Sequence, residues 1–344
     1  MAAGGFTTEY TMIEVAKSIG AQGNDLALVD TLSQRTPFLE EGYWMEADDF
    51  QSHHFMQALT EPVGVDSVIN VGVGWDVYAQ TPVTELIQGI EDYLRIDMRI
   101  LTKRRNPQQY LKQQTDGFVR GLVKTIHDRI LYGNYLDLSG AGGVGVGPST
   151  SIGGRSADRI NGLAQRYNTI ATNPWYNVTS LAGAGANAQS STWTLVWGPQ
   201  GVFFVYPHGG QNFIKVTDMG EQLVYDSNSK PYTAYVVHFL IQFGLCVADP
   251  RKAQRLCNMT TTTGWTSTAQ LKSMGQLPDG LDGAVLYVPR WVFTAIQIDA
   301  TGYGIANSAK FYTKEEIWGH QQTLFQGVPI RMCERLATNE AIVS

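Results

Sequence analysis

NGLAQRYN at 161–168, STWTLVWGPQGVFFVYPHG at 191–209 and AYVVHFLIQFGLCVADPRKAQRLCN at 234–258 are the stretches that decide how this sequence is interpreted. They are rich in aromatic and β-branched residues, are interrupted by glycine, and contain few of the residue types that carry out catalysis. β-Branched and aromatic side chains fit the half-buried surface of a sheet. The three stretches therefore predict strands that build a surface, and they favour a structural protein over an enzyme.

The size and composition of the chain predict a well-folded protein whose main activity is not nucleic-acid binding. Its 344 residues are 43% hydrophobic and 16% charged, which is enough apolar material for the core of one large or two smaller domains. The net charge of −6 and the pI near 5.5 argue against tight binding to nucleic acid, because that affinity grows with the number of Lys and Arg side chains laid against phosphates. Weak, nonspecific contact with DNA stays open.

Cysteine usage and the lack of long apolar runs predict a cytosol-like location during synthesis. Cys246, Cys257 and Cys333 are odd in number and have no C-x-x-C spacing, so we expect buried, reduced thiols rather than disulfides or a zinc site. The sequence contains no run of about 18 apolar residues, and its first residues have neither a basic start nor an apolar segment. We therefore expect neither a signal peptide nor a membrane span.

The first 78 residues predict extended segments that need a partner. Two short amphipathic helices are expected at 11–20 and 25–34, and the second ends before Pro37, because the residue preceding a proline avoids helical geometry. From 50 to 78 the alternation of apolar and polar residues, interrupted by glycines, is typical of a long irregular hairpin. A hairpin of this size cannot bury its own faces, so we expect it to pack on another part of the chain or on another subunit.

One long helix is expected from Asn106-Pro107 to Gly133, with a cap and a proline at its start and a glycine at its end. About 27 residues give a length of roughly 40 Å. Its apolar stripe contains Leu111, Phe118, Leu122, Ile126 and Ile130, and largely off that stripe are Lys112, Arg120, Lys124 and Asp128. A helix with a single apolar face is expected to lie across a sheet.

The remainder of the chain predicts a mixed α+β architecture. The glycine-rich run at 139–154 is expected to be a loop or linker. Strands are predicted at 193–207 and 235–247, a strand followed by the start of a helix within 278–296, and a strand with a Gly-Val-Pro bend within 323–336.

Glycine and histidine motifs that resemble catalytic or binding sites are better explained by ordinary structure. The run Gly140–Gly145 has the spacing of a dinucleotide fingerprint, but it follows a predicted helix and no acidic residue follows it in a second strand. The segment 143–150 lacks the lysine of a phosphate-binding loop. The adjacent His53 and His54 point to opposite faces of an extended segment, so they cannot easily share a metal ion and are predicted to be surface or interface histidines.

Charged pairs and clusters are likewise expected to be solvated. His127-Asp128 is predicted to lie on the surface of the long helix, with no G-x-S-x-G or H-E-x-x-H motif elsewhere in the chain. The carboxylate pairs Asp48-Asp49 and Glu315-Glu316 diverge from each other in a loop or strand. The basic cluster at 103–105 is interpreted as a solvated run, with contact to DNA or to an acidic neighbour as the alternative. The sequence therefore assigns no catalytic, cofactor-binding or metal-binding residue.

Taken in order, the arm, hairpin and long helix ending in LYGN at 131–134, followed by NGLAQRYN, VWGPQGVFFVYPHG, GLCVADPRKAQRLCN and FQGVPIRMCERL, resemble the major capsid proteins of tailed double-stranded DNA bacteriophages. The chain is most similar to the branch that includes the coat proteins of phage epsilon fifteen and a Bordetella phage. The resemblance runs from about Met12 to Val343. It implies the Hong Kong 97-like fold and a shell built by self-assembly into pentamers and hexamers around the genome.

The resemblance also implies a division of the chain. Residues 1–48 would be the N-terminal arm, 49–85 the extended E-loop, 86–160 the P-domain with the spine helix at 106–133, 161–305 the A-domain with associated strands, and 306–344 the return to the P-domain. Implied partners are further copies of the chain, scaffolding, portal and cement or decoration proteins, and packaged DNA in weak nonspecific contact, with no membrane. The shell would be assembled in the host bacterial cytoplasm and would end in the virion.

Some family members crosslink covalently through a lysine of the E-loop, but residues 50–78 contain no lysine, so we expect no autocatalytic crosslinking. Two alternatives stay open. An encapsulin-like nanocompartment protein would share the fold. A β-rich carbohydrate-binding or tail-fibre protein would instead bind sugars through exposed tryptophans such as Trp193 and Trp197.

Overall fold

A computed structural model of the chain describes nine stretches of it. These are residues 37–133, 160–170, 177–181, 189–209, 214–226, 228–260, 264–300, 312–317 and 320–343. The helices expected at 11–20 and 25–34, and the glycine-rich run at 139–154, lie outside the described residues. The chain divides into two compact units, a smaller one that includes Gly89–Val123 and Asn212–Ile241, and a larger one that includes Gln34–Gln88, Lys124–Gln211 and Gln242–Ser344.

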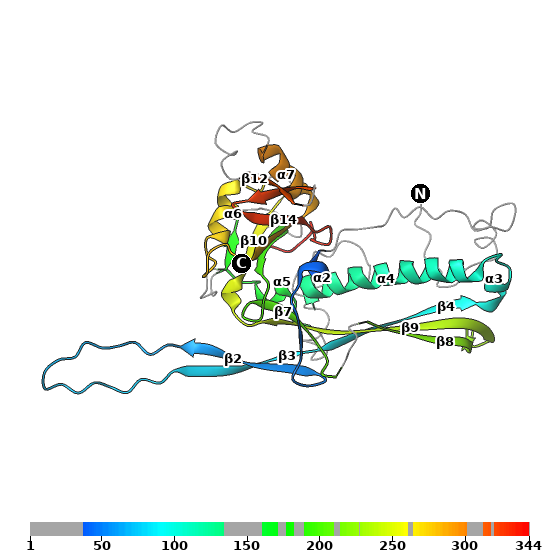
Figure 1. The fold of residues 1–344 in the computed structure, drawn as a ribbon, viewed down its shortest axis with the longest axis horizontal. Coiled ribbons are helices and arrows are strands. Elements are labelled where there is room, and N and C mark those ends of the chain that lie inside the picture. Colours follow the sequence, from blue (N-terminus) through cyan, green and yellow to red (C-terminus); the bar gives the residue numbers. More distant parts are fainter. Residues whose placement is uncertain are drawn as a thin grey trace. The chain divides into compact units, whose positions relative to one another are not determined.

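The smaller unit combines long antiparallel strands with most of a long helix. Its elements are β4 (Gln88–Asp97), α3 (Met98–Thr102), α4 (Pro107–Tyr132), β8 (Ile214–Tyr225) and β9 (Pro231–Val247), of which α4 and β9 continue into the larger unit. β8 and β4 both pair with β9, and β8 is antiparallel to it with a bulge between Asp218 and Gly220. Figure 1 shows the first part of α4 running alongside these strands.

Local signals at both ends set the length of α4, which confirms the predicted helix. The Gln109 N–H donates to the Asn106 side chain at 3.4 Å, the Asn106 amide donates back to Gln109 at 3.3 Å, and Pro107 is the first helical residue. The helix ends at Tyr132, where Gly133 takes φ +52°, a left-handed conformation that glycine adopts without a steric penalty.

The predicted apolar stripe of α4 is largely buried. Phe118 stacks on Phe239 of β9, with ring centroids 5.7 Å apart, and Leu122 is 5% exposed. In the part of α4 that belongs to the larger unit, Ile126 and Ile130 are fully buried. Leu111, near the start of the helix, is only half-buried.

The expectation of surface positions for His127 and Asp128 is wrong. His127 is completely buried and its ring lies 5.7 Å from that of Phe38, while Asp128 accepts a hydrogen bond from Arg335 Nε at 2.7 Å. Burial raises the pKa of Asp128, although the Arg335 guanidinium opposes the shift. The last turns of α4 are covered on more than one side, and the periodicity of a helix alone does not reveal this.

The larger unit contains two sheets and a separate hairpin. In one sheet β1 (Trp44–Glu46) pairs in parallel with β7 (Val202–Tyr206), which is antiparallel to the end of β9. The other has the order β12-β13-β14-β11-β6-β10-β5. Its strands are β12 (Tyr312–Ile317), β13 (His320–Phe325), β14 (Val328–Met332), β11 (Ala284–Val288), β6 (Ser190–Val196), β10 (Ala253–Met259) and β5 (Val178–Ser180).

Short helices and the hairpin complete the larger unit. The helices are α2 (Phe38–Glu41), α5 (Leu163–Arg166), the 3-10 helix η2 (Pro250–Lys252), α6 (Ser267–Met274) and α7 (Arg290–Ala300); the hairpin pairs β2 (Ser52–Thr60) with β3 (Ala79–Leu86). The strand predicted at 235–247 is confirmed by β9, whereas the run predicted as strand at 193–207 contains two strands, β6 and β7, which are separated by a turn and lie in different sheets. The single bent strand expected within 323–336 is two antiparallel strands, because Gln326 and Gly327 both take positive φ and form a full turn.

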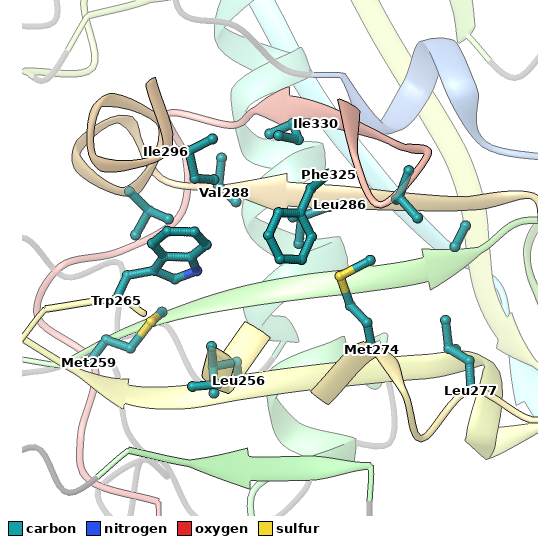
Figure 2. Close-up of a cluster of buried hydrophobic side chains, with 14 residues drawn as sticks. Leu256, Met259, Trp265, Met274, Leu277, Leu286, Val288, Ile296, Phe325 and Ile330 are labelled. Atoms are coloured by element: carbon teal, nitrogen blue, oxygen red, sulfur yellow. The ribbon is translucent and has the colours of Figure 1, made fainter. Parts of the chain in front are cut away.

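The main hydrophobic core of the larger unit lies on the seven-stranded sheet. Side chains from β10, β11 and β14 meet others from α6 and α7 (Figure 2). Trp265, just before α6, packs edge-on against Phe325 at the end of β13, with a centroid distance of 6.2 Å. Both rings are nearly or fully buried, so this contact fixes α6 against the sheet.

The WGPQG sequence forms the tight connection from β6 to β7. The Gly201 N–H donates to the Gly198 carbonyl at 3.0 Å, and a Cβ at Gly201 would lie 2.4 Å from the Val196 carbonyl oxygen. Trp197 then donates its indole N–H to the Tyr287 hydroxyl at 2.7 Å, and Phe38 stacks on Tyr287 at 4.2 Å. The glycine allows a close backbone approach, and the tryptophan ties the turn to β11.

A buried ion pair fastens the C-terminal residues to the sheet. Arg255 donates to Glu340 at 2.9 Å, and both side chains are at most 3% exposed. Tyr132, at the end of α4, also donates to Glu340, at 2.9 Å. Burial alone would lower the pKa of Arg255, but the Glu340 carboxylate outweighs it and holds that pKa above its ordinary value. Arg255 therefore stays charged, and its contact with Glu340 joins β10, α4 and the C-terminal segment.

Burying a charge on α4 should destabilise the protein. We expect Leu122→Asp to cost on the order of 3 kcal/mol or more, because it places an unpaired carboxylate at a site that is 5% exposed and removes apolar contact. The product should be insoluble or should melt well below the parent. Leu122→Met, which nearly preserves the volume, should cost less than about 1.5 kcal/mol. Equal melting temperatures for the Asp variant and the parent would show that this face of the helix is wrongly assigned.

Removing the Glu340 carboxylate should also lower stability. Glu340→Ala leaves the Arg255 guanidinium buried without its carboxylate, and we expect a loss of about 3–5 kcal/mol in the free energy of unfolding. Glu334→Ala is the control, because Glu334 pairs at 3.8 Å with an Arg290 side chain that is 77% exposed. That variant should lose less than about 1 kcal/mol. Urea denaturation of unassembled subunits measures both, and similar losses would contradict the network.

Candidate assembly surface

Residues 52–86 form a projecting hairpin, called the arm below. β2 and β3 are antiparallel from the Ser52–Leu86 pair to the Thr60–Ala79 pair. Between them, residues 61–78 form no strand, and their turn is closed by a hydrogen bond from the Val71 N–H to the Val68 carbonyl at 3.2 Å. In Figure 1 this loop extends beyond β2 and β3, away from the sheets of the larger unit. The predicted hairpin is confirmed.

The arm loop exposes an unusual amount of apolar surface. Ile69 is 89% exposed and Trp75 is 98% exposed. The full set of exposed apolar side chains is Val63, Val65, Val68, Ile69, Val71, Val73, Trp75, Val77 and Tyr78. Contiguous apolar exposure on this scale marks a surface that binds another molecule. The loop also carries Glu61, Asp66 and Asp76, and the arm contains no Lys or Arg, so it is acidic as well as apolar.

The alternating valines of the loop were expected to belong to the hairpin strands, and the structure differs here. No ladder hydrogen bonds extend into residues 61–78, since the pairing ends at Thr60 and Ala79. A strand pair gains stability when one face packs on something. In a single chain this loop has no such surface, so the strand-like residues of its sequence remain unpaired.

The base of the arm is held by a buried ion pair. Arg166 donates from both terminal nitrogens to Glu85 of β3, at 2.5 and 2.7 Å, and also donates to the Leu245 carbonyl at 3.1 Å. Both charged side chains are at most 14% exposed. Burial would lower the pKa of Arg166, but the Glu85 carboxylate outweighs it and keeps that pKa above its ordinary value. One guanidinium thus joins the arm to the end of β9.

This anchor explains the NGLAQRYN sequence. Arg166 ends the short helix α5, and its Nε donates to the Asn161 carbonyl at 2.9 Å. Gly162 lies directly against Gly133 at the end of α4, where a Cβ on either residue would come within 2.5 Å of the other backbone. Tyr167 donates its hydroxyl to the Pro250 carbonyl at 3.0 Å. The motif therefore holds the end of α4, the base of the arm and the turn after β9 together.

Apolar contacts complete the base. A small core of Ala47, Phe203, Val205 and Cys246 packs against the partly buried side chains of Met45, Phe55, Ile87 and Ala248. Gln57 of β2 donates to the Ala248 carbonyl at 3.3 Å. The arm is therefore fixed at its base and exposed at its loop.

The cysteines lie in the interior, as predicted. All three are free and buried. Burial raises the pKa of Cys257 to about 11 and that of Cys333 to about 12, and it also raises the pKa of Cys246. All three thiols therefore stay protonated and unreactive at neutral pH.

His53 and His54 point to opposite faces of β2, as predicted. His53 is 7% exposed, packs edge-on against Phe203 and pairs with Asp48 at 2.9 Å. His54 is exposed and shares a 2.9 Å hydrogen bond with Thr84 across the hairpin. The expected surface position is therefore correct for His54 and wrong for His53, whose ring fills the base of the arm. Asp48 and Asp49 are exposed, as predicted.

The other candidates do not converge on a site. Arg104 was expected to be solvated but is 6% exposed, with its guanidinium 4.3 Å from the centroid of the Tyr110 ring. Glu315 and Glu316 lie in β12, and the prediction for their side chains stays a prediction. The run Gly140–Gly145 and the segment 143–150 lie outside the described residues. In the described stretches, no group of three or more His, Cys, Asp or Glu could hold a metal, and no helix there is long and apolar enough to cross a membrane.

The tryptophans argue against a sugar-binding surface. Trp193 is 0% exposed, and Trp197 is only partly exposed, with its indole N–H committed to Tyr287. Binding a sugar by stacking requires an accessible ring face, which Trp193 lacks. The carbohydrate-binding alternative therefore loses the residues on which it depended.

The sequence and the fold of this chain both match those of known proteins. The family described as major capsid protein GP7 matches residues 20–145 and 150–344, which is nearly the whole chain. No match is found among curated proteins. Among solved structures, a chain from the cryo-EM structure of bacteriophage Epsilon15 has a TM-score of 0.69 and 22% identity, and the match covers 100% of both chains.

Two further solved structures are more distant. The bacteriophage JBD30 capsid has a TM-score of 0.48 and 12% identity, with 89% of this chain and 93% of that chain covered. The holo-SrpI encapsulin complex of Synechococcus elongatus has a TM-score of 0.39 and 13% identity, with 70% and 95% covered. Both TM-scores are below 0.5. The chain therefore has the Hong Kong 97-like fold, belongs to the major capsid protein GP7 family and is a capsid shell protein.

Proposed function

We propose that this chain assembles into the pentamers and hexamers of an icosahedral shell that encloses the double-stranded DNA genome of a tailed bacteriophage. The observation that carries the proposal is the arm, which is rigidly anchored at Glu85 and exposes nine large apolar side chains at its loop. Rings with local five- and six-fold relations use heterologous contacts, in which one patch meets a different patch on the next subunit. An anchored apolar arm supplies such a patch.

The division of the chain follows the same proposal. Residues 1–48 act as the N-terminal arm, 49–85 as the E-loop, 86–160 as the P-domain with its spine helix, 161–305 as the A-domain, and 306–344 as the return to the P-domain. In support, the hairpin of β2 and β3 spans 52–86 and so exceeds the segment 49–85 by one residue, and α4 falls within 106–133. Each segment then has a separate task in the shell.

Partners and location complete the proposal. The chain assembles in the host cytoplasm with copies of itself, meets scaffolding, portal and cement or decoration proteins, and touches packaged DNA weakly. It has no turnover on any substrate. The weak contact with DNA is supported by the composition of the arm, which contains no Lys or Arg and whose loop has only carboxylates as charged groups. The lack of a lysine in the arm also means that subunits are not crosslinked through it.

The encapsulin-like alternative shares the fold but not the family. The family model that covers nearly the whole chain is that of a major capsid protein. A cargo enzyme gene beside the coding gene, in place of portal and terminase genes, would favour the alternative.

Assembly of the wild-type chain is the direct test. Sedimentation at micromolar concentration, with and without scaffold, should show species far larger than a tetramer, and electron microscopy should show rings or closed shells. The same shells boiled in detergent should run as a single 37.9 kDa band, because no bond joins the subunits. A product that remains a monomer or dimer under all conditions would contradict the proposed function, and a ladder of multimers would contradict the absence of crosslinking.

The arm should be needed for assembly and not for folding. Replacing 61–78 with a short Gly-Ser turn keeps β2, β3 and the Arg166–Glu85 anchor, and shortening a loop costs little free energy. We expect a soluble monomer with an unchanged melting temperature and no shells. Circular dichroism and electron microscopy on one sample measure both.

A pair of point variants sharpens this experiment. Trp75→Ser removes a side chain that is 98% exposed, so the monomer should melt as the parent does while assembly weakens. Asp76→Asn, the next residue, is the matched control and should leave assembly nearly intact. If Trp75→Ser lowers the melting temperature of the monomer, the loop belongs to the core of its own subunit. If the variant that lacks 61–78 forms normal shells, the arm is not an interface.

A further inference from the structure

The two halves of the arm loop match each other in length. The β2–β3 ladder ends at the Thr60–Ala79 pair, and the loop turns at the hydrogen bond from the Val71 N–H to the Val68 carbonyl. Residues 61–67 and 72–78 lie between these two points, so each half contains seven residues. The register of the last ladder pair therefore continues without a shift to the turn.

That register gathers the large apolar side chains of the second half of the loop on one face. Opposite residues of an antiparallel pair share a face, and the face alternates along each strand. Val71, Val73, Trp75 and Val77 then lie on one face, called the tryptophan face below, whereas Asp76 lies on the other. These four apolar residues are at least 55% exposed. The tryptophan face is thus a row of apolar groups that its own chain leaves uncovered.

Two residues of the first half shape the tryptophan face. Gly64 is opposite Trp75 in this register, and a Cβ at Gly64 would have no neighbour within 4 Å, so no side chain covers the indole ring from across the hairpin. Asp66 is opposite Val73 and diagonal to Trp75, a separation that long side chains span. The tryptophan face therefore carries one carboxylate close to its exposed ring.

The larger unit has an open groove between the start of α7 and the C-terminal segment. Pro289, Trp291 and Thr294 line it on one side, and Leu336 and Thr338 line it on the other. Its volume is about 680 Å³, which is in the range of sites that hold a small molecule. The groove is therefore large enough for an indole ring and a flanking valine side chain.

Both walls of the groove are held by contacts with the rest of the larger unit. Trp291 packs against the main hydrophobic core. Leu336 is 4% exposed, and the next residue, Ala337, donates its N–H to the Tyr132 hydroxyl at 2.7 Å. The groove is therefore preformed, and binding costs little entropy for ordering its walls.

The exposed charge at the groove is positive. The Arg290 side chain is 77% exposed and lies 3.8 Å from Glu334, whose side chain is only 17% exposed. The charged residues of the arm loop are all carboxylates, and Asp66 is the one that shares a face with Trp75. A guanidinium can bind a carboxylate with two parallel hydrogen bonds. Arg290 and the tryptophan face are therefore complementary in charge.

We propose that the groove beside α7 receives Trp75 from a second copy of this chain, with Asp66 of that copy paired to Arg290. The inference rests on the proposed function, since it names the surface that the arm contacts during assembly. Within one chain Trp75 is 98% exposed while the groove is open, so the two do not meet there. Each chain has one arm and one groove, so every subunit gives an arm to one neighbour and receives an arm from another, which is a heterologous contact.

Filling the groove tests whether it receives the arm. Thr294→Trp adds an indole at an exposed groove position, so the monomer should melt as the parent does, while shell formation should need a subunit concentration about tenfold higher or more. Thr268→Trp is the matched control, because Thr268 is an exposed threonine of α6 that does not line the groove. It should assemble as the parent does. Sedimentation over a series of concentrations measures both, and equal assembly by the two variants would overturn the inference.

An exchange of charges tests the contact at single residues. Asp66→Arg and Arg290→Asp each place like charges together at exposed positions, so each should weaken assembly several-fold without changing the melting temperature. The double variant restores opposite charges and should recover most of that loss. Asp76→Arg combined with Arg290→Asp is the control and should recover nothing, because Asp76 lies on the other face. A double variant at 66 and 290 that assembles no better than the weaker single variant would contradict the pairing.

The outcomes also separate this inference from the proposed function. Failure of the parent to assemble would overturn the proposed function. If the parent assembles, the variant that lacks 61–78 does not, and the groove and charge variants all behave as the parent does, the arm contacts a different surface and this inference alone fails.

Discussion

The orientation of the arm, and with it any contact that the arm makes, depends on the buried ion pair between Arg166 and Glu85. An arm that is exposed along its loop gains no stability from that loop, so its direction must be set at its base. The guanidinium satisfies Glu85 with two hydrogen bonds and the Leu245 carbonyl with another, while Gly162 brings α5 against the end of α4. A bidentate pair restricts geometry more than an apolar contact does. The arm can therefore be presented to a neighbour in one orientation.

The energetics of the loop explain why a single subunit does not bury it. Full burial of one Val or Ile side chain is worth roughly 1.5–3 kcal/mol, and the loop exposes nine large apolar residues. These side chains stay exposed when one chain folds, so their burial can stabilise the association of subunits instead. Association also costs translational and side-chain entropy. The surplus per contact is then modest, and modest contacts allow subunits to exchange until a shell closes correctly.

The sequence predicts elements better than it predicts burial. The caps at Asn106 and Gly133 are local, so the limits of α4 could be inferred from a few residues. Burial of Arg104 accompanies its packing over the Tyr110 ring, which a run of three basic residues does not reveal. Burial of His127 and Asp128 depends on Phe38 and Arg335, which are far away in the sequence, and no periodicity shows that these side chains will pack there. Glu85 was missed for the same reason: its partner lies 81 residues away. The only available signal was Arg166 within a motif otherwise made of apolar and amide residues.

The distribution of charge restricts what the arm can bind. Its loop exposes nine large apolar side chains, and the only charged groups in residues 61–78 are the carboxylates of Glu61, Asp66 and Asp76. A surface of this kind repels other acidic surfaces and suits contact with another protein. Because the arm contains no Lys or Arg, burial of its apolar side chains is the main contribution that it can make to such a contact.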